Sequence, residues 1–350
     1  MKKFFAVIGN PPYQEEQINE FDAGKKNFAP PIYHSFLSEA YKVSDKVEMI
    51  HPARFLFNAG ATPKEWNEKM LSDEHLSVLY YEEKSEKVFP SLSTPIKGGV
   101  VVTMHDMAKK YRAIEVFTPY NELNEVLAKV KNHESYRSIS DIVYSRSTYR
   151  LTPELHIDFP KAASMLSKGH LYDMSSNIFK CIPQVFYDKS PDDDKEYVCI
   201  LGIKDNRVYK YIDRKYVKKV DNLDKYKVFI AQAYGSGSLG ETMSDIVIEK
   251  PGVGATESFI SIGAFGTRKE ASNVANYIKT KFVRVLIGVL KVTPMANKPV
   301  WKYVPLQDFT SKSDIDWTKS VHEIDLQLYK KYGLSKEEKD FIETHVKEMV

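Results

Sequence analysis

The first part of the chain, to about residue 110, alternates between strand-like and helix-like patterns of apolar side chains. Residues 4–9 (FFAVIG) are uniformly apolar, as in a buried parallel strand, and a Pro-Pro turn follows soon after them. Residues 32–44 follow Pro31 and repeat apolar side chains at helical spacing, which predicts an amphipathic helix. The face of that helix expected to be buried holds Ile32, Phe36, Leu37, Ala40 and Tyr41.

The following segments continue this alternation. A strand that runs into a loop is expected at residues 47–57, a helix at 62–75, and two more strands at 76–83 and 98–105. The order strand, helix, strand, helix, strand, strand is that of half a doubly wound α/β sheet ending in a hairpin. A complete nucleoside-binding sheet needs more strands, so we expect the front half of the sheet to be missing from this chain.

After about residue 116 the alternation stops, and short β-like runs separated by Gly, Pro and Asp predict a mixed α+β region. Four strand-bearing segments are expected there, at residues 178–203, 208–212, 227–234 and 257–265. One long helix is expected at residues 268–291, and a short helix near the C-terminus.

Two capping boxes mark the starts of these helices, Thr267 with Glu270 and Ser335 with Glu338. Together the patterns predict three segments. Residues 1–115 form half of an α/β sheet, residues 116–330 form an α+β domain, and residues 331–350 form a C-terminal helix.

The composition excludes some classes of protein but does not by itself indicate a function. A chain of 350 residues with 43% hydrophobic and 28% charged residues can bury a large core. Its apolar runs are too short for a membrane span or a secretory signal, so we expect a cytoplasmic location and no membrane partner. Two cysteines and nine scattered histidines predict neither a disulfide framework nor a bound metal.

The formal net charge of +3 is mild, but two stretches concentrate basic residues. Residues 204–219 hold seven Lys or Arg against two Asp, interleaved with three tyrosines, and residues 279–302 hold six Lys or Arg and no acid. Such mixtures suit phosphate contacts and base stacking, although solvated faces of a strand and a helix are the alternative. The candidate DNA-contacting residues are Arg207, Lys210, Arg214, Lys215, Lys218, Lys219, Lys281 and Arg284.

The tetrapeptide Asn10-Pro11-Pro12-Tyr13 directly follows the first expected strand, where open α/β sheets place their ligand sites. The side-chain oxygen of Asn10 and the main-chain carbonyl of Pro11 can accept the two N–H bonds of an exocyclic amine, and the prolines hold both acceptors rigidly. Tyr13 offers an aromatic face for a base taken out of the duplex. The alternative is a stiff turn followed by a packing residue.

These residues carry a family resemblance. IGNPPYQ at residues 8–14 resembles motif IV of the amino-methylating DNA methyltransferases, in particular the adenine-specific, type IIG-like enzymes of restriction–modification systems. The likeness covers nearly the whole chain, and its further segments are residues 51–57, 87–102, 226–241, 256–267, 277–284, 298–309 and 328–349.

The resemblance implies the C-terminal half of a Rossmann-like methyltransferase sheet followed by a target-recognition domain. It implies transfer of a methyl group from S-adenosylmethionine to N6 of a flipped adenine in double-stranded DNA, with Asn10, Pro11, Pro12 and Tyr13 as the catalytic residues. It also implies that Lys97, before Gly98 and Gly99, lines the target-base pocket; a simple tight turn is the alternative.

One departure from the family is serious. The family's donor-binding elements precede motif IV, whereas here the motif begins nine residues after Met1. We therefore expect an incomplete donor site and an upstream polypeptide that carries the missing half. The alternative is a non-catalytic remnant that only binds DNA through its target-recognition module. A third reading, an oxidoreductase built on Gly235-x-Gly237-x-x-Gly240, is remote because the residues after that pattern predict a turn and a strand, not a helix.

Overall fold

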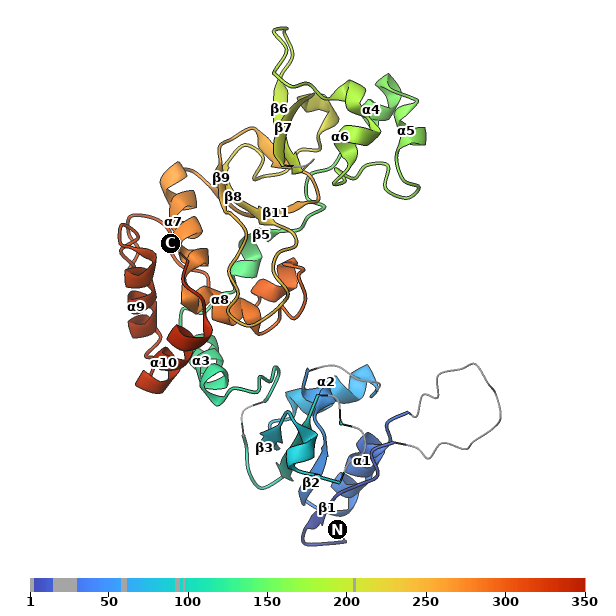
Figure 1. Ribbon diagram of the computed structural model, residues 1–350, viewed down its shortest axis with the longest axis vertical. Helices are drawn as coiled ribbons and strands as arrows, with labels where there is room; N and C mark the ends of the chain where they lie inside the picture. Colours follow the sequence, from blue (N-terminus) through green and yellow to red (C-terminus); the bar gives the residue numbers. More distant parts are fainter. Residues whose placement is uncertain are drawn as a thin grey trace, which may run out of the picture. The chain divides into compact units, whose positions relative to one another are not determined.

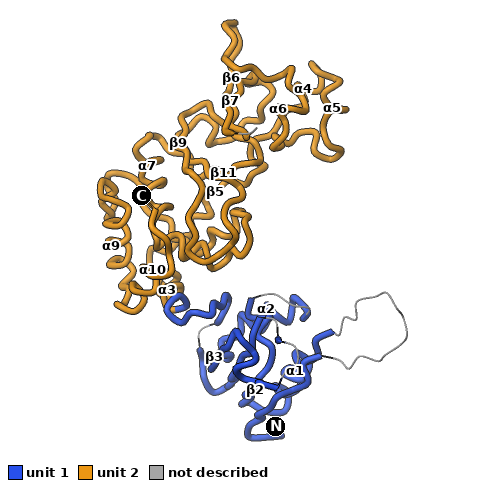
Figure 2. Tube along the Cα trace, in the orientation of Figure 1, with its two compact units in different colours: residues 1–124 blue, residues 125–350 orange. Residues whose placement is uncertain are grey.

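The computed structural model describes residues 3–14, 30–57, 62–91, 95–96, 98–111, 113–203 and 206–349. The chain forms two compact units, unit 1 with residues 1–124 and unit 2 with residues 125–350 (Figures 1 and 2). The division falls within α3 (Asn121–Asn132). Residues 116–124 thus lie with unit 1, and residues 331–350 lie with unit 2.

The described residues of unit 1 form a four-stranded mixed sheet, the helices α1 and α2, and the first residues of α3 (Figure 1). Its sheet has the order β1-β2-β4-β3, in which β1 is parallel to β2 and β4 is antiparallel to both of its neighbours. The elements are β1 (Val7–Gly9), α1 (Tyr33–Val43), β2 (Lys46–Pro52), a 3-10 helix (Arg54–Phe57), α2 (Lys64–Ser72), β3 (Leu76–Glu82), a second 3-10 helix (Ser85–Lys87) and β4 (Val100–Asp106).

The core of unit 1 forms where α1 covers the sheet. Tyr33, Leu37 and Ala40 of α1 are buried, and they share a cluster with Val47 and Met49 of β2. These α1 residues follow the i, i+4, i+7 spacing that makes one helical stripe. Phe36 was expected on the buried face but is 45% exposed, because it lies at the margin of that stripe.

The first strand differs from its expectation. It is parallel to β2, as expected, but Phe5 is 87% exposed and Ile8 is 77% exposed. Among the described residues β1 pairs with β2 alone, so it forms an edge of the sheet. The expected burial of residues 4–9 is therefore wrong for the chain as the structure describes it. An apolar strand stays exposed when no element covers it.

Unit 2 contains two further sheets, β10-β6-β7 and β5-β11-β8-β9 (Figure 1). Its strands are β5 (Val143–Tyr144), β6 (Tyr197–Ile203), β7 (Arg207–Asp213), β8 (Tyr226–Ala231), β9 (Val247–Glu249), β10 (Val253–Ala255) and β11 (Phe259–Phe265). Its helices after α3 are α4 (Pro153–Asp158), α5 (Ala162–Met165), α6 (Ile178–Cys181), α7 (Arg268–Lys279), α8 (Lys281–Gly288), α9 (Val321–Lys331) and α10 (Lys336–His345), with short 3-10 helices at Ile139–Ile142, Pro183–Val185, Arg214–Tyr216 and Lys298–Trp301.

Both capping boxes are confirmed: the hydroxyls of Thr267 and Ser335 accept the N–H groups of Glu270 and Glu338, and the N–H groups of Thr267 and Ser335 donate to the carboxylates of these glutamates. The segment from residue 178 starts as α6 and a 3-10 helix rather than a strand, and β6 begins only at Tyr197. That part of the expectation was wrong. A short apolar run does not by itself separate a strand from a buried helical turn.

The helix expected at residues 268–291 is two helices that meet at Thr280. Thr280 has extended backbone angles, and its hydroxyl accepts the N–H of Val283 as the cap of α8. The carboxylate of Asp325 accepts the N–H groups of Lys281 and Phe282 at 2.9 and 2.8 Å. The break is therefore stabilised by a residue from α9, which the local pattern could not reveal.

Candidate functional site

The sheet order of unit 1 brings several loops to one edge. Because β1 and β2 are parallel, their carboxyl ends lie side by side, and the antiparallel β4 begins at the same edge, where Val100 pairs with Pro52. The residues that follow β1, those that follow β2 and the turn before β4 therefore converge. This is the edge at which open α/β sheets bind ligands.

Backbone contacts join the loop after β2 to the turn before β4 at this end of the sheet. The N–H of Ala53 donates to the carbonyl of Gly99 at 3.0 Å. Gly98 has φ +83°, and a Cβ there would lie 2.7 Å from Cγ of Arg54. A side chain at position 98 would thus be strained and would push the exposed Arg54 side chain away. Lys97, assigned to the target-base pocket by the resemblance, lies outside the described residues.

Asn10 and Pro11 differ in exposure although they are adjacent. The Asn10 side chain is exposed and makes no hydrogen bond to a described residue, whereas Pro11 is buried. A polar amide on a chain fixed by a buried proline is a preorganised group that is free to meet a ligand. The exposed Asn10 side chain is therefore not part of the core formed by the described residues.

Tyr13 is half-buried. Its carbonyl accepts the N–H of Ile32 at 3.1 Å, which ties the motif to the start of α1. Its ring meets Phe89 edge-on, with ring centroids 6.5 Å apart. Its hydroxyl is buried without a hydrogen-bond partner among the described residues, and burial raises its pKa to about 12. The hydroxyl is therefore neutral near pH 7, and the ring rather than the charge is what Tyr13 can offer a ligand.

Sequence reasoning gave no role to His51, which is completely buried beneath this edge. Its ring stacks on Tyr33 with centroids 5.4 Å apart, and its Nε2 lies 2.9 Å from the hydroxyl of Thr103. Burial lowers its pKa to about 4, so the ring is neutral at physiological pH. His51 links α1, β2 and β4 and so positions the edge, but it does not reach solvent.

The basic residues of the 204–219 stretch are mostly engaged within unit 2. Arg207 donates to the carbonyl of Asp245, Lys210 pairs with Asp188, Arg214 pairs with Asp224, and Lys215 pairs with Asp158 at 2.7 Å. Lys218 and Lys219 differ from them. Both are exposed, and neither makes an ion pair or a side-chain hydrogen bond with a described residue.

Lys281 and Arg284 lie in the interior, which argues against their expected contact with DNA. Lys281 pairs with Glu343 and Glu348 at 2.6 and 3.2 Å. Arg284 is 3% exposed, and its guanidinium donates to main-chain carbonyls, including that of Lys279 at 2.9 Å. These residues hold α8 to its surroundings. A buried, fully bonded cation cannot reach a phosphate without unfolding its contacts.

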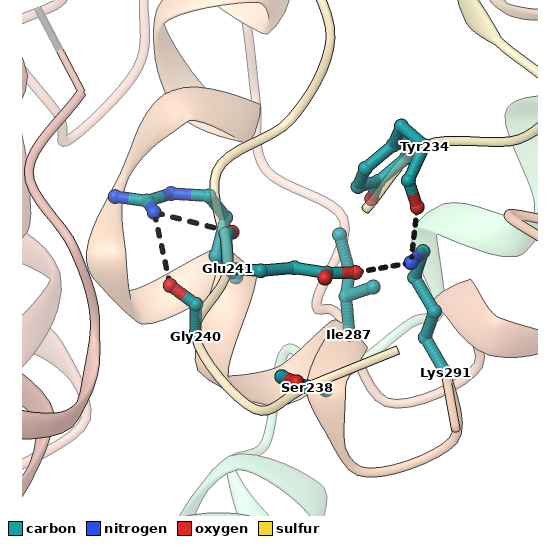
Figure 3. Close-up of a pocket in the computed structure, with 8 residues that line it drawn as sticks. Tyr234, Ser238, Gly240, Glu241, Ile287 and Lys291 are labelled. Atoms are coloured by element: carbon teal, nitrogen blue, oxygen red, sulfur yellow. Dashed lines mark hydrogen bonds and ion pairs between the residues drawn. The ribbon is translucent and has the colours of Figure 1, made fainter. Parts of the chain in front are cut away.

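The glycine-rich loop at residues 235–240 already holds an anion from its own chain (Figure 3). The carboxylate of Glu241 accepts the N–H groups of Ser236 and Gly237 at 2.7 and 3.2 Å, and it pairs with the buried ammonium of Lys291. The cavity that remains is only about 10 Å³. The loop therefore leaves no room for a nucleotide phosphate, and it leads to strand β9 rather than to a helix, as expected.

The described residues contain no cluster of three or more His, Cys, Asp or Glu side chains placed to hold a metal ion. Among these same residues, none of the helices is both long and apolar enough to cross a membrane.

A comparison with family models gives a match for part of the chain. Residues 1–89 match the family model for the Eco57I restriction-modification methylase. The search of curated proteins found no match. Among solved structures, the type IIG restriction endonuclease BpuSI is similar over 91% of this chain and 50% of that one, with 10% identity and a TM-score of 0.32.

Two Type ISP restriction-modification enzymes are also similar. LlaGI, solved as a nuclease-deletion mutant in complex with a DNA substrate mimic, has 9% identity and a TM-score of 0.28, over 98% of this chain and 35% of that one. LlaBIII, bound to DNA, has 11% identity and a TM-score of 0.26, over 98% and 30%. The chain thus spans half or less of the length of each. Its first quarter, which carries the Asn-Pro-Pro-Tyr motif, is similar to the restriction-modification methylases.

Proposed function

We propose that this chain is the catalytic and target-recognition part of an adenine-N6 DNA methyltransferase of a restriction–modification system. The observation that carries the proposal is the position of Asn10-Pro11-Pro12-Tyr13. The motif follows a parallel strand at the ligand-binding edge of the sheet, its Asn10 amide is exposed and unbonded among the described residues, and it lies inside the segment similar to the methylase family.

The proposed chemistry rests on two acceptors and one ring. The Asn10 side-chain oxygen and the Pro11 carbonyl accept the two N–H bonds of the target amine, which draws its lone pair out of the ring and towards the methyl group. The neutral Tyr13 ring stacks on the flipped adenine. Pro12 keeps the acceptors in place because its φ angle is fixed.

S-adenosylmethionine is the methyl donor that this function implies. The described residues of unit 1 fit the acceptor side of the reaction, with an exposed amide and an aromatic ring beside it. The glycine-rich loop of unit 2 does not fit the donor, because Glu241 fills its amide groups. We therefore propose that donor binding does not reside in this loop and is supplied by a partner polypeptide.

The exposed strand β1 supports a partner that supplies this binding. Among the described residues one side of the β1 main chain is unpaired, and Phe5 before the strand and Ile8 within it expose apolar side chains; such an edge is a template for a further strand. We propose that an upstream polypeptide with the donor-binding half of the sheet pairs there.

Unit 2 is the proposed target-recognition domain for double-stranded DNA. Lys218 and Lys219 are exposed and make no ion pair or side-chain hydrogen bond with a described residue. The ion pairs of Arg207, Lys210, Arg214 and Lys215 each include a partly exposed carboxylate, and exposed pairs contribute little to stability. Such pairs can exchange their carboxylate for a phosphate at low cost, so these six residues remain the proposed contacts.

The test is methyl transfer by the chain together with a polypeptide that carries a glycine-rich donor-binding segment. Labelled methyl groups should enter adenine of duplex DNA, and Asn10→Ala should lower the rate on the order of 10²–10³-fold. Gln14→Ala is the matched control, because it also removes an exposed amide from the same segment. Full activity of Asn10→Ala would refute the mechanism.

A second candidate is a DNA-binding module without catalysis. It is favoured by the self-contained core of unit 2, which uses no residue of β1. The same assay separates the two. Duplex binding without any methyl incorporation, with the donor-binding polypeptide present, would establish the second function and exclude the first.

A further inference from the structure

A cavity of about 520 Å³ opens in unit 2, away from the Asn-Pro-Pro-Tyr motif in sequence. It lies between the β6–β7 hairpin and the turn that links β9 to β10. The residues that line it include Tyr197, Cys199, Tyr209, Tyr211, Glu249 and Lys250. The volume lies within the range of small-molecule and cofactor sites in proteins, which is roughly 300–1,000 Å³.

The register of the hairpin places the aromatic side chains together. Cys199 pairs with Tyr211, and Leu201 pairs with Tyr209. Because alternate residues of a strand point to the same face, Tyr197, Tyr209 and Tyr211 all belong to one face of this sheet. The cavity therefore has three tyrosine rings along one wall, a surface on which flat heterocycles stack.

A second part of the lining is the Lys250–Gly252 turn beside β6, and hydrogen bonds hold it in place. The ammonium of the fully buried Lys227 donates to the carbonyls of Leu223, Lys250 and Val253 at 2.9, 3.1 and 2.8 Å. Gly252, with φ +79°, accepts the N–H of Cys199 at 2.9 Å. A wall fixed before the ligand arrives lowers the entropy that binding has to overcome.

The polar groups of the cavity are arranged for a neutral ligand. Glu249 accepts the hydroxyl of Tyr209 at 2.6 Å through one carboxylate oxygen, which leaves the other oxygen as an acceptor. Asp188 is paired with Lys210. Lys250 is exposed and makes no ion pair with a described residue. The lining thus holds two carboxylates and the ammonium group of Lys250, and Lys210, outside the lining, compensates the charge of Asp188, so no excess charge remains with which to select a cation.

From this arrangement we propose that the cavity binds one unpaired nucleobase of DNA that carries an exocyclic amine, as cytosine and adenine do. The base stacks on the tyrosine wall, its amine donates to Glu249, and Lys250 meets the adjoining phosphate. Thymine is disfavoured, because its carbonyl oxygen in place of the amine faces the carboxylate. The proposal rests on the proposed function only in taking DNA as the source of the base.

The test uses the full chain and short single-stranded oligonucleotides, oligo(dC) and oligo(dT), with fluorescence anisotropy as the readout. Oligo(dC) should bind more tightly than oligo(dT). Tyr209→Ala should weaken oligo(dC) binding by about 5- to 100-fold, the range for loss of one stacking ring. Glu249→Gln should abolish the preference for oligo(dC), since an amide can donate to thymine as well as accept from cytosine.

Tyr144→Ala is the matched control, because the Tyr144 hydroxyl also donates to a carboxylate, that of Asp221, at 2.8 Å but outside the cavity. It should leave binding unchanged. Equal losses in Tyr144→Ala and Tyr209→Ala, measured on variants with native circular dichroism, would overturn the proposal. So would equal affinity for the two oligonucleotides.

Failure of this site and failure of the proposed methyl transfer give different results. Tyrosine-dependent binding of oligo(dC) by a chain that never methylates DNA upholds the cavity and refutes only the transfer. Methyl transfer with no oligonucleotide bound at the cavity refutes the cavity alone.

Discussion

Strands β1 of unit 1 and β8 of unit 2 come from similar apolar runs but have opposite fates. In β8, Val228, Phe229 and Ile230 are completely buried. In the run that contains β1, Phe5 before the strand and Ile8 within it are mostly exposed. The difference lies in their neighbours, because β8 pairs with β9 on one side and β11 on the other, whereas β1 pairs only with β2 among the described residues.

The comparison teaches that an apolar run specifies a strand but not its burial. Burial needs a layer that covers the face of the strand, and α7 supplies part of that cover for β8. In unit 2 the apolar strand β8 lies between two other strands of the same unit. The buried cations of unit 2 are paired with carboxylates or donate to main-chain carbonyls. Unit 1 leaves an apolar edge beside its candidate catalytic motif.

The largest expected effect concerns the buried ion pair of unit 2. Lys291→Met removes the ammonium that pairs with Glu241 and donates to the Tyr234 carbonyl at 2.9 Å. The carboxylate left behind should destabilise unit 2 by about 3–5 kcal/mol. Denaturant unfolding followed by hydrogen exchange in each unit measures this.

The control for that variant is Lys42→Met in unit 1, where the pair with Glu39 is about two-thirds exposed on both sides. It should cost less than about 0.5 kcal/mol. Similar losses for the two variants would mean that the Lys291 pair is no more valuable than a surface pair.

The second effect is an opposite response of the units to pH. The pKa of His51 is lowered by burial to about 4 in the fold, against about 6.5 unfolded, so the unfolded chain binds the extra proton. This stabilisation of unit 1 is complete above pH 6.5 and is lost as the pH falls towards 4, by about 3 kcal/mol.

In unit 2, burial raises the pKa of Asp325 to about 6, against an ordinary value of 3.8, so here the folded chain binds the extra proton. Its contribution is complete below about pH 4 and is lost as the pH rises to 6, again by about 3 kcal/mol. Unfolding of each unit measured between pH 4 and 7, in wild type, His51→Gln and Asp325→Asn, should show the two slopes and their loss. Parallel slopes in both units would contradict this assignment.

The third effect tests which basic residues of unit 2 meet DNA. Lys218→Ala with Lys219→Ala should reduce the slope of log affinity against log salt by about 2, one for each released phosphate contact. The control pair, Lys319→Ala with Lys336→Ala, removes two other exposed lysines and should leave the slope unchanged. If both double variants flatten the slope equally, binding is a diffuse property of the surface.

The smallest effect is expected at β1. Phe5→Ser with Ile8→Thr should change the thermal stability of the isolated chain by no more than about 0.5 kcal/mol, because both side chains are already exposed. Val47→Thr in the neighbouring β2 is the buried counterpart and should cost clearly more. A stability loss above 1 kcal/mol from the β1 variant would show that this edge is covered within the chain.

Local sequence patterns determined much of this protein. The strand and helix order of unit 1, the capping boxes at Thr267 and Ser335, and the turn-then-strand after the glycine-rich loop could all be read from the sequence. Each depends on contacts within a few residues, such as a side chain that bonds the N–H three positions on. The Asn-Pro-Pro-Tyr motif stood out for the same reason, since its rigidity comes from its own prolines.

The tertiary structure alone decided the features that depend on distant residues. Asp325 from α9 stabilises the helix break at Thr280 by accepting N–H groups at the start of α8, and the carboxylate of Glu241 occupies the glycine-rich loop that matches a nucleotide pattern. Lys281 and Arg284 look like a basic surface in sequence but are buried, because burial is fixed by what packs against a residue, not by its own type. The exposure of β1 follows the same rule, because β1 pairs with β2 and yet Ile8 stays 77% exposed, since pairing alone does not cover a side chain.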